Sequence, residues 1–203
     1  MDQIALPFDW PAPEVAESFI VTDANRVAVE GVESPARWPV RAAILTGPRK
    51  SGRSLLGRIF AAKTGGTLID DGELHREADV FHRWNLAQEE RKPLLIVALH
   101  PPPQWKVRLP DLASRLNATP VFMIGQPDDL LASMLLQKLF ERRGLQVTPE
   151  TLSYIVTRIE RSYIALMRVV DLLDDLAMSR RRAVTIKLAR EVLAEMGADA
   201  IRT

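Results

Sequence analysis

The sequence predicts an α/β fold in which helices cover both faces of a parallel sheet, followed by a small all-α subdomain. Short apolar runs alternate with helical apolar patterns through the first part of the chain, and this alternation is typical of a parallel sheet. A glycine-bearing loop joins the first of these runs to a helical pattern. Beyond residue 126 only helical periodicity is found.

Four apolar runs predict the strands, at 41–46, 67–69, 93–99 and 120–124. The first leads into the glycine loop, and the second ends in Asp70 and Asp71. The run at 93–99 is continuously apolar, as expected when both faces of a sheet are covered. Three prolines at 101–103 end that strand.

The helices are predicted from apolar residues at helical spacing. Such spacing indicates a helix over 54–63, which the glycines at 65 and 66 end. Thr148 followed by Pro149 is a typical helix start, because a capping hydroxyl precedes a proline in the first turn. The other predicted helices span 78–90, 109–116, 128–143, 161–178 and 186–196.

Composition excludes several classes of function. The chain of 203 residues has no cysteine, so disulfides and thiolate metal sites are excluded. Its net charge of +1 disfavours a protein that acts mainly on nucleic acid, and we expect direct DNA binding to be weak or absent. No run is long and apolar enough to span a membrane, and no secretory signal is found at the start, so we expect a cytoplasmic protein.

The loop from Gly47 to Ser54 follows the P-loop pattern, between a predicted strand and a predicted helix. In such loops backbone N–H groups and the helix N-terminus hold phosphates, a lysine reaches the outer phosphates, and a hydroxyl holds Mg²⁺. Here Arg53 stands in the lysine position, which keeps the charge but replaces a compact ammonium with a bulkier planar fork. The alternative is a glycine-bearing turn with basic residues by chance.

Asp70 and Asp71 end the second predicted strand and supply the other half of this site. An acidic residue there holds Mg²⁺ through a water, beside the hydroxyl of Ser54, and the next can polarise an attacking water. Without the P-loop, the same pattern would be an ordinary strand leaving the core.

Several segments together resemble the DnaA/Hda branch of the AAA+ ATPases. Residues 19–26 resemble the segment that packs against adenine, and 68–71 resemble the Walker B strand. The octet at 109–116 resembles the family's arginine-finger segment and is the most specific match, and 160–161 resemble the start of the lid helix that carries the sensor 2 arginine. The resemblance implies a tail over 1–13, a AAA+ nucleotide-binding subdomain over 14–125 and a helical lid over 126–203.

The resemblance also implies roles for individual residues. An adenine nucleotide, ADP or ATP with Mg²⁺, would contact Gly47, Pro48, Lys50, Ser51, Gly52, Arg53, Ser54, Leu55, Asp70, Asp71 and Arg161, with its base near Ile20, Val21, Asn25 and Arg26. Arg115 would be an arginine finger that acts on a nucleotide bound to a neighbouring subunit. The alternative for Arg115 is a surface arginine at the C-terminal end of a short helix, which cations favour.

The sequence departs from the family pattern in three ways. The distance between the P-loop helix and Asp70 leaves out one strand–helix unit, so we expect a shortened core. The stretch 97–99 is wholly apolar where a polar sensor residue is usual. With Arg53 in the lysine position, these features favour a site that holds a nucleotide over one that hydrolyses it. The sequence ends with the lid, so we expect no helix-turn-helix domain for reading DNA.

The N-terminal segment 3–8 resembles the peptide by which bacterial replication proteins bind the sliding clamp. Leu6 and Phe8 would enter an apolar cleft of the clamp, while the Gln3 amide would make hydrogen bonds at its rim. The alternative is a tail that folds back on its own domain.

The resulting hypothesis is an Hda-like negative regulator of replication initiation. Its partners would be the sliding clamp (the β subunit of DNA polymerase III) and DnaA, whose ATP hydrolysis Arg115 would stimulate, and a homodimer is compatible with this scheme. A DnaA-family adaptor that does not stimulate hydrolysis is the alternative, and an autonomous ATPase is disfavoured by Arg53 and the apolar stretch 97–99.

Overall fold

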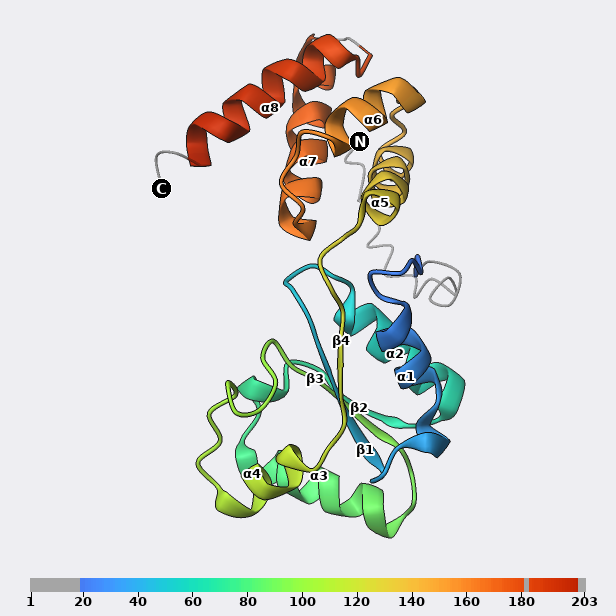
Figure 1. The fold of residues 1–203 in the computed structure, drawn as a ribbon, viewed down its shortest axis with the longest axis vertical. Helices are drawn as coiled ribbons and strands as arrows, with labels where there is room; N and C mark the ends of the chain where they lie inside the picture. The colour runs from blue at the N-terminus through green and yellow to red at the C-terminus, as the bar shows by residue number, and fades with distance from the viewer. Residues whose placement is uncertain (1–18, 181–182, 201–203) are drawn as a thin grey trace, which may run out of the picture.

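The computed structural model describes residues 19–180 and 183–200, with side chains through 197. It consists of an α/β base and a helical lid, which the chain joins by one crossing between β4 and α5 (Figure 1). In chain order the elements are α1 (Arg26–Glu33), β1 (Ala42–Thr46), α2 (Arg53–Thr64), β2 (Thr67–Ile69), α3 (Glu77–Glu89), β3 (Leu94–Val97), α4 (Pro110–Asn117), β4 (Val121–Met123), α5 (Asp129–Arg142), α6 (Pro149–Val156), α7 (Tyr163–Arg180) and α8 (Ile186–Ala200), with 3-10 turns at Pro35–Arg37 and Gly72–Leu74.

The sheet of the described residues has four parallel strands in the order β2-β3-β1-β4. Leu94 lies opposite Ala42 in the central pair, and Ile44 lies opposite Val121 at the β4 edge. Every residue of β1 and β3 is buried, which explains why these strands are read as continuous apolar runs. The predicted α/β fold with a parallel sheet is confirmed.

Helices cover both faces of the sheet, as predicted. On one face, α1 and α2 pack on the side chains of Ala43, Leu45 and Leu95. On the other face, α3 and α4 pack on their neighbours in the strands, among them Ile44 and Ile96. These two layers place the start of α2 and the end of β3 at the same edge of the sheet, below the lid (Figure 1).

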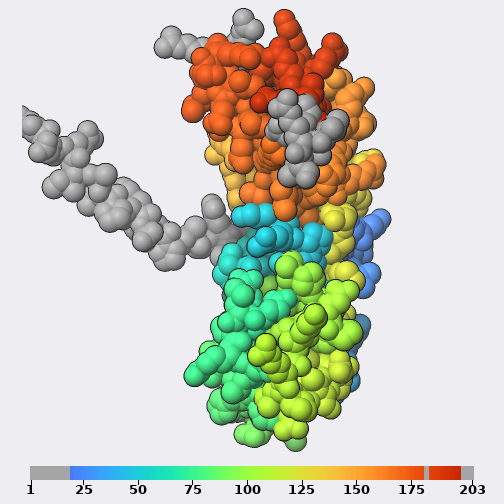
Figure 2. Space-filling view, turned by 90° about the vertical axis from the view of Figure 1, so that its left-hand side faces the viewer, coloured from blue at the N-terminus to red at the C-terminus, as the bar shows by residue number. Residues whose placement is uncertain are grey.

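The lid has its own core, built by α5 to α8 around Leu136, Phe140 and Val169. Thr148 caps α6 as predicted, because its side chain accepts a hydrogen bond from the Thr151 N–H. Leu131 and Tyr163 of the lid instead belong to the core of the base, so the two parts share apolar packing. In Figure 2 the cyan surface of the P-loop segment lies where the orange lid meets the green base.

Helix α1 is a feature that sequence patterning did not predict. Its β-branched residues and internal Gly31 are poor helix formers. Burial of Ala28, Val29 and Val32 against the sheet stabilises the helix instead. Gly31 is required there because a Cβ at that position would lie 2.3 Å from the Phe122 ring.

No helix within the described ranges combines the length and the apolarity that a bilayer crossing requires.

Candidate functional site

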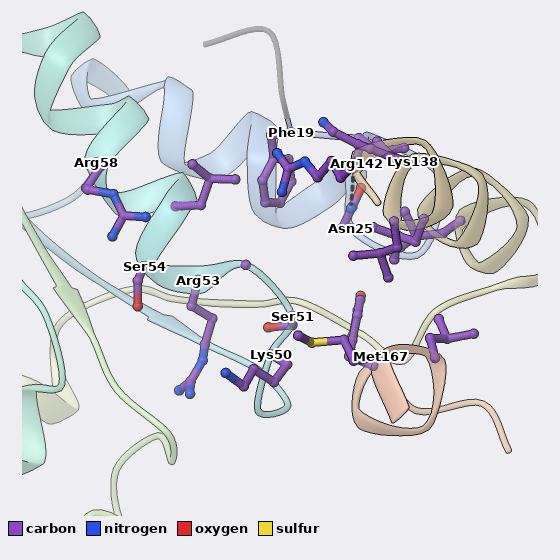
Figure 3. Close-up of a pocket in the computed structure, with 18 residues that line it drawn as sticks. Phe19, Asn25, Lys50, Ser51, Arg53, Ser54, Arg58, Lys138, Arg142 and Met167 are labelled. Carbon is purple, nitrogen blue, oxygen red and sulfur yellow. Dashed lines mark hydrogen bonds between the residues drawn. The ribbon is translucent and has the colours of Figure 1, made fainter. Parts of the chain in front are cut away.

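A cavity of about 410 Å³ lies between the P-loop and the lid. Its described walls come from the segment before α1, the loop and first turns of α2, and the lid helices α5 and α7 (Figure 3). The apolar part of the lining comes from the lid and is formed by Leu131, Leu135, Leu139, Leu166 and Met167. The loop and the start of α2 add a polar and cationic part, so the cavity fits a ligand that has both an apolar ring and phosphates.

The P-loop has the backbone conformation that the glycine pattern predicts. Gly52, with φ 88°, precedes the first residue of α2, and the N-terminus of that helix therefore opens on the cavity. A Cβ on Gly52 would lie 3.0 Å from Cε2 of Phe19, which also lines the cavity. Ser51 Oγ lies in the same loop, is buried, and has no hydrogen-bond partner among the described residues. An unsatisfied hydroxyl at this position fits a ligand that accepts its hydrogen bond.

Arg53 lies at the first position of α2 (Figure 3). Its Nη1 donates a hydrogen bond to the carbonyl oxygen of Ala98. The charge in the lysine position is therefore tied to the backbone of the apolar stretch 97–99. That stretch is fixed further by Glu73, whose Oε1 accepts from the N–H groups of Leu99 at 2.5 Å and His100 at 2.8 Å.

Ser54 and Asp70 are brought together as the sequence predicts. Ser54 Oγ donates to Asp70 Oδ1 at 3.0 Å, across the gap between α2 and β2. Asp71 is exposed and has φ 50°, so its backbone turns the chain away from the sheet. A hydroxyl beside a carboxylate at the phosphate end fits the ligand set that Mg²⁺ takes in nucleotide sites.

The cavity contains more positive charge than the sequence pattern indicated. Arg58 of α2 and Lys138 and Arg142 of α5 line it together with Lys50 and Arg53. Among the described lining residues there is no aspartate or glutamate. Such a surplus favours an anionic ligand. The sequence carried no local signal for these three additional cations, because Lys138 and Arg142 reach the cavity only through the tertiary placement of the lid.

The segment predicted to contact adenine is ordered by its own hydrogen bonds. Asn25 Oδ1 accepts from the Thr22 N–H at 2.9 Å, and Asn25 Nδ2 donates to the Ile20 carbonyl at 2.8 Å. Asn25 therefore shapes this segment, and both ends of its amide are already engaged. Ile20 and Asn25 line the cavity, while Val21 and Arg26 are not part of its lining.

Arg26 forms an ion pair with Asp23 at 2.7 Å, on the exposed side of the segment. Arg161, predicted to touch the phosphates, likewise forms an ion pair with Asp129 at 2.9 Å, and both side chains are more than half exposed. Arg161 is not part of the described lining of the cavity. The lid cations that do line it are Lys138 and Arg142.

Tyr163 joins the lid to the base at the back of the cavity. Its hydroxyl donates to the Gly125 carbonyl at 3.0 Å. Burial, with a smaller contribution from the nearby Asp128 carboxylate, raises the pKa of Tyr163 to about 12. Asp128 also caps α5 through the Leu131 N–H at 2.7 Å and accepts from the Ala24 N–H at 3.3 Å, so one carboxylate links the lid to the segment before α1.

Arg115 lies in the last turn of α4, on the sheet face opposite α2. Its guanidinium carbon is 4.8 Å from the ring centroid of Phe81 and 4.7 Å from that of Trp84. Arg115 is not part of the described lining of the cavity. The predicted clamp-binding residues, Gln3, Leu6 and Phe8, lie outside the described residues.

Comparison with known proteins matches the lid region to a described family. Residues 129–193 match the family model described as the Hda lid domain. An uncharacterized protein of Haemophilus influenzae is 30% identical over 118 residues, which cover 58% of this chain and 51% of that protein. The chain thus spans about half the length of this curated relative.

Solved structures show the same fold. Domain III of the Thermotoga maritima replication initiation protein DnaA is similar with a TM-score of 0.71 at 17% identity, covering 91% of this chain and 97% of that one. AMPPCP-bound DnaA from Aquifex aeolicus has a TM-score of 0.61 at 16% identity, covering 84% of this chain and 67% of that one. Thermotoga maritima RuvB has a TM-score of 0.63 at 11% identity, covering 90% of this chain and 72% of that one. The chain therefore combines a base that has the fold of DnaA domain III with a lid region, residues 129–193, that matches the Hda lid domain.

Proposed function

We propose that this protein is a regulator of the replication initiator DnaA, which stimulates hydrolysis of DnaA-bound ATP through Arg115. In this scheme residues 3–8 bind the sliding clamp, and the protein's own cavity holds an adenine nucleotide that orders the lid against the base. The Hda-type lid over 129–193 and the DnaA-like base support a role next to DnaA. The match to AMPPCP-bound DnaA supports an adenine nucleotide as the ligand.

The observation that carries the proposal is the placement of Arg115 relative to the cavity. Arg115 lies on α4, while the cavity is formed by α2 and the lid on the other side of the sheet. An arginine in that position lies away from the nucleotide site of its own chain, which supports a role on a nucleotide held by a neighbouring subunit. An arginine supplied in trans stabilises the charge that develops on the transferred phosphoryl group and can increase the rate by about 10³–10⁵-fold.

The protein's own site is suited to holding a nucleotide. Lys50, the start of α2 and the Ser51 hydroxyl can bind phosphates, and Ser54 with Asp70 can hold Mg²⁺, which would neutralise phosphate charge. The Arg53 guanidinium is engaged with the Ala98 carbonyl, and the stretch 97–99 offers no polar side chain to an outer phosphate. We therefore expect slow hydrolysis by the isolated protein.

The test is the rate of ATP hydrolysis by DnaA in the presence of DNA-loaded clamp. We expect the parent protein to raise this rate and Arg115→Ala to lose most of the effect. Arg83→Ala is the matched control, because Arg83 is exposed on the neighbouring helix α3. If Arg115→Ala stimulates as well as the parent, Arg115 is not the finger.

The clamp interaction is tested separately by binding to purified clamp. We expect the double variant Leu6→Ala/Phe8→Ala to lose binding while its thermal unfolding stays at the parent temperature. Undiminished binding would remove the segment 3–8 from the mechanism.

A second candidate is an adaptor that binds DnaA without stimulating hydrolysis. The shortened core and the apolar stretch 97–99 favour it, because both depart from the pattern of a nucleotide-hydrolysing relative. The adaptor predicts that DnaA is bound by the parent and by Arg115→Ala alike, with no change in hydrolysis.

A further inference from the structure

Two aromatic rings of α3 hold the Arg115 side chain in one place. Phe81 and Trp84 lie three residues apart on α3 and face the end of α4. The guanidinium carbon lies 4.8 Å and 4.7 Å from their ring centroids, within the range of cation–π attraction. Trp84 is 7% exposed, whereas Arg115 and Phe81 are partly exposed. The arginine therefore contacts one buried ring, Trp84, and one partly exposed ring, Phe81.

Hydrogen bonds fix the backbone that carries Arg115 to the same helix. The Trp84 indole N–H donates to Thr119 Oγ1 at 3.0 Å, and Thr119 Oγ1 in turn donates to the carbonyl oxygen of Arg115 at 2.8 Å. At the other end of α4, the Glu77 carboxylate accepts from the N–H groups of Arg108 at 2.9 Å and Leu109 at 2.7 Å. Helix α3 therefore fixes both ends of α4 and orients Trp84 relative to Arg115.

We propose that Trp84 and Phe81 are positioning residues for Arg115, which pre-orient its guanidinium for a neighbouring subunit's nucleotide. This proposal rests on the proposed function of Arg115. A free arginine side chain loses much rotamer freedom when it is fixed in a complex. Because the rings and the Thr119 contact restrict it beforehand, less freedom is lost when the partner's phosphates are reached.

The closest alternative is that Trp84 is only a core residue, and Trp38 provides the matched control for that role. Trp38 is also 7% exposed, and its indole N–H also donates one hydrogen bond, to the Gly31 carbonyl at 2.8 Å. Trp38 packs on Phe60 on the opposite face of the sheet, away from Arg115. Replacing Trp38 should therefore remove a similar amount of buried contact as replacing Trp84, while the surroundings of Arg115 stay unchanged.

The test uses the full chain in the DnaA hydrolysis assay with DNA-loaded clamp. The variants are Trp84→Leu, Phe81→Leu, Trp84→Phe and the control Trp38→Leu. We expect Trp84→Leu and Phe81→Leu each to lower the maximal stimulated rate about five-fold, which corresponds to the loss of one cation–π contact. The concentration that gives half of the maximal stimulation should stay unchanged. Trp84→Phe keeps an aromatic face and should retain most of the rate, and Trp38→Leu should stay at the parent rate.

A second measurement, by NMR, uses the isolated protein without DnaA or clamp. It tests the orientation of Arg115 independently of the proposed function. In the isolated protein, the δ-methylene proton resonances of Arg115 should be shifted by the ring currents of the two aromatic rings. Trp84→Leu should remove most of that shift, and Trp38→Leu should leave it in place. Phe81→Leu serves as a second variant if Trp84→Leu unfolds, because Phe81 is only partly buried and its side chain can make no hydrogen bond.

The outcomes discriminate clearly. A parent-like or increased maximal rate for both leucine variants would overturn the proposal, since the rings would then be dispensable or would hold Arg115 back. An Arg115→Ala variant that stimulates fully would instead overturn the proposed function. In that case the Arg115 resonances still decide whether the rings orient the side chain, and unchanged shifts in Trp84→Leu would overturn the positioning role itself.

Discussion

Replacing Gly52 with alanine perturbs the phosphate loop at the residue where α2 begins. Gly52 has φ 88°, a left-handed conformation that costs a residue with a side chain about 1–2 kcal/mol. The new Cβ would also lie 3.0 Å from Cε2 of Phe19, so the ring that lines the cavity must shift by a few tenths of an ångström. The strain is either kept, which lowers the free energy of unfolding, or relieved by a change in the loop.

Gly65→Ala is the matched control because it places the same strain at the other end of the same helix. Gly65 has φ 64°, and a Cβ there would have no atom within 4 Å. We expect Gly65→Ala to keep its strain and to lose about 1–2 kcal/mol of unfolding free energy in urea titrations, whereas in Gly52→Ala a change in the loop relieves most of the strain. Gly52→Ala should instead bind a fluorescent adenine nucleotide more weakly, by about 5–30-fold, because binding must restore the strained loop.

Equal nucleotide affinity of the two variants would contradict a role of the Gly52 conformation in binding. The Gly52 conformation would then have no part in holding phosphate, and the cavity would need another assignment. A loss of affinity in Gly65→Ala would refute it too, because that position lies at the C-terminal end of α2, away from the cavity lining.

Three further predictions concern a helix cap, the hydroxyl–carboxylate pair of Ser54 and Asp70, and a pH dependence of stability. Thr148→Ala removes the cap of α6 and should lower the free energy of unfolding by about 1 kcal/mol in urea titrations, while Thr148→Ser should not. Asp70→Asn should abolish the increase in nucleotide affinity that Mg²⁺ produces, measured by titration with and without the ion, because Ser54 would lose its charged neighbour. The pKa of Glu77 is held below its usual range, mainly by the backbone N–H groups at the start of α4, so its contribution to stability is present at neutral pH and is lost as the pH falls through that lowered pKa. Unfolding free energy measured from about pH 5 downward should therefore fall more steeply for the parent than for Glu77→Gln, and parallel curves would contradict this.

Much of the fold could be predicted because its strands are buried on both faces. The strand runs contain few polar residues, so β1 and β3 were identifiable without any knowledge of their partners. The cap at Thr148 was local and was predicted correctly. Helix α1 was not predicted, since its stability comes from packing on the sheet and from the close approach of Gly31 to Phe122, neither of which the local sequence records.

In the site, too, the features set by local sequence could be predicted, and those set by tertiary packing could not. The P-loop and the meeting of Ser54 with Asp70 follow from a motif and a strand end, and both were predicted. The bond from Arg53 to the Ala98 carbonyl depends on a side chain crossing to a strand 45 residues away, which no motif specifies. Helix packing likewise decides that Lys138 and Arg142 line the cavity. It also decides that Arg115 contacts two aromatic rings.

Action of Arg115 on a partner's nucleotide is measured most directly by phosphate release from labelled ATP held by DnaA, in a single turnover with DNA-loaded clamp. The protein is supplied with unlabelled ADP, so that only hydrolysis on DnaA is counted. We expect fast release with the parent protein and release at the unstimulated rate with Arg115→Ala. Equal release with the two proteins would contradict it, because Arg115 would then contribute nothing to the chemistry on its partner.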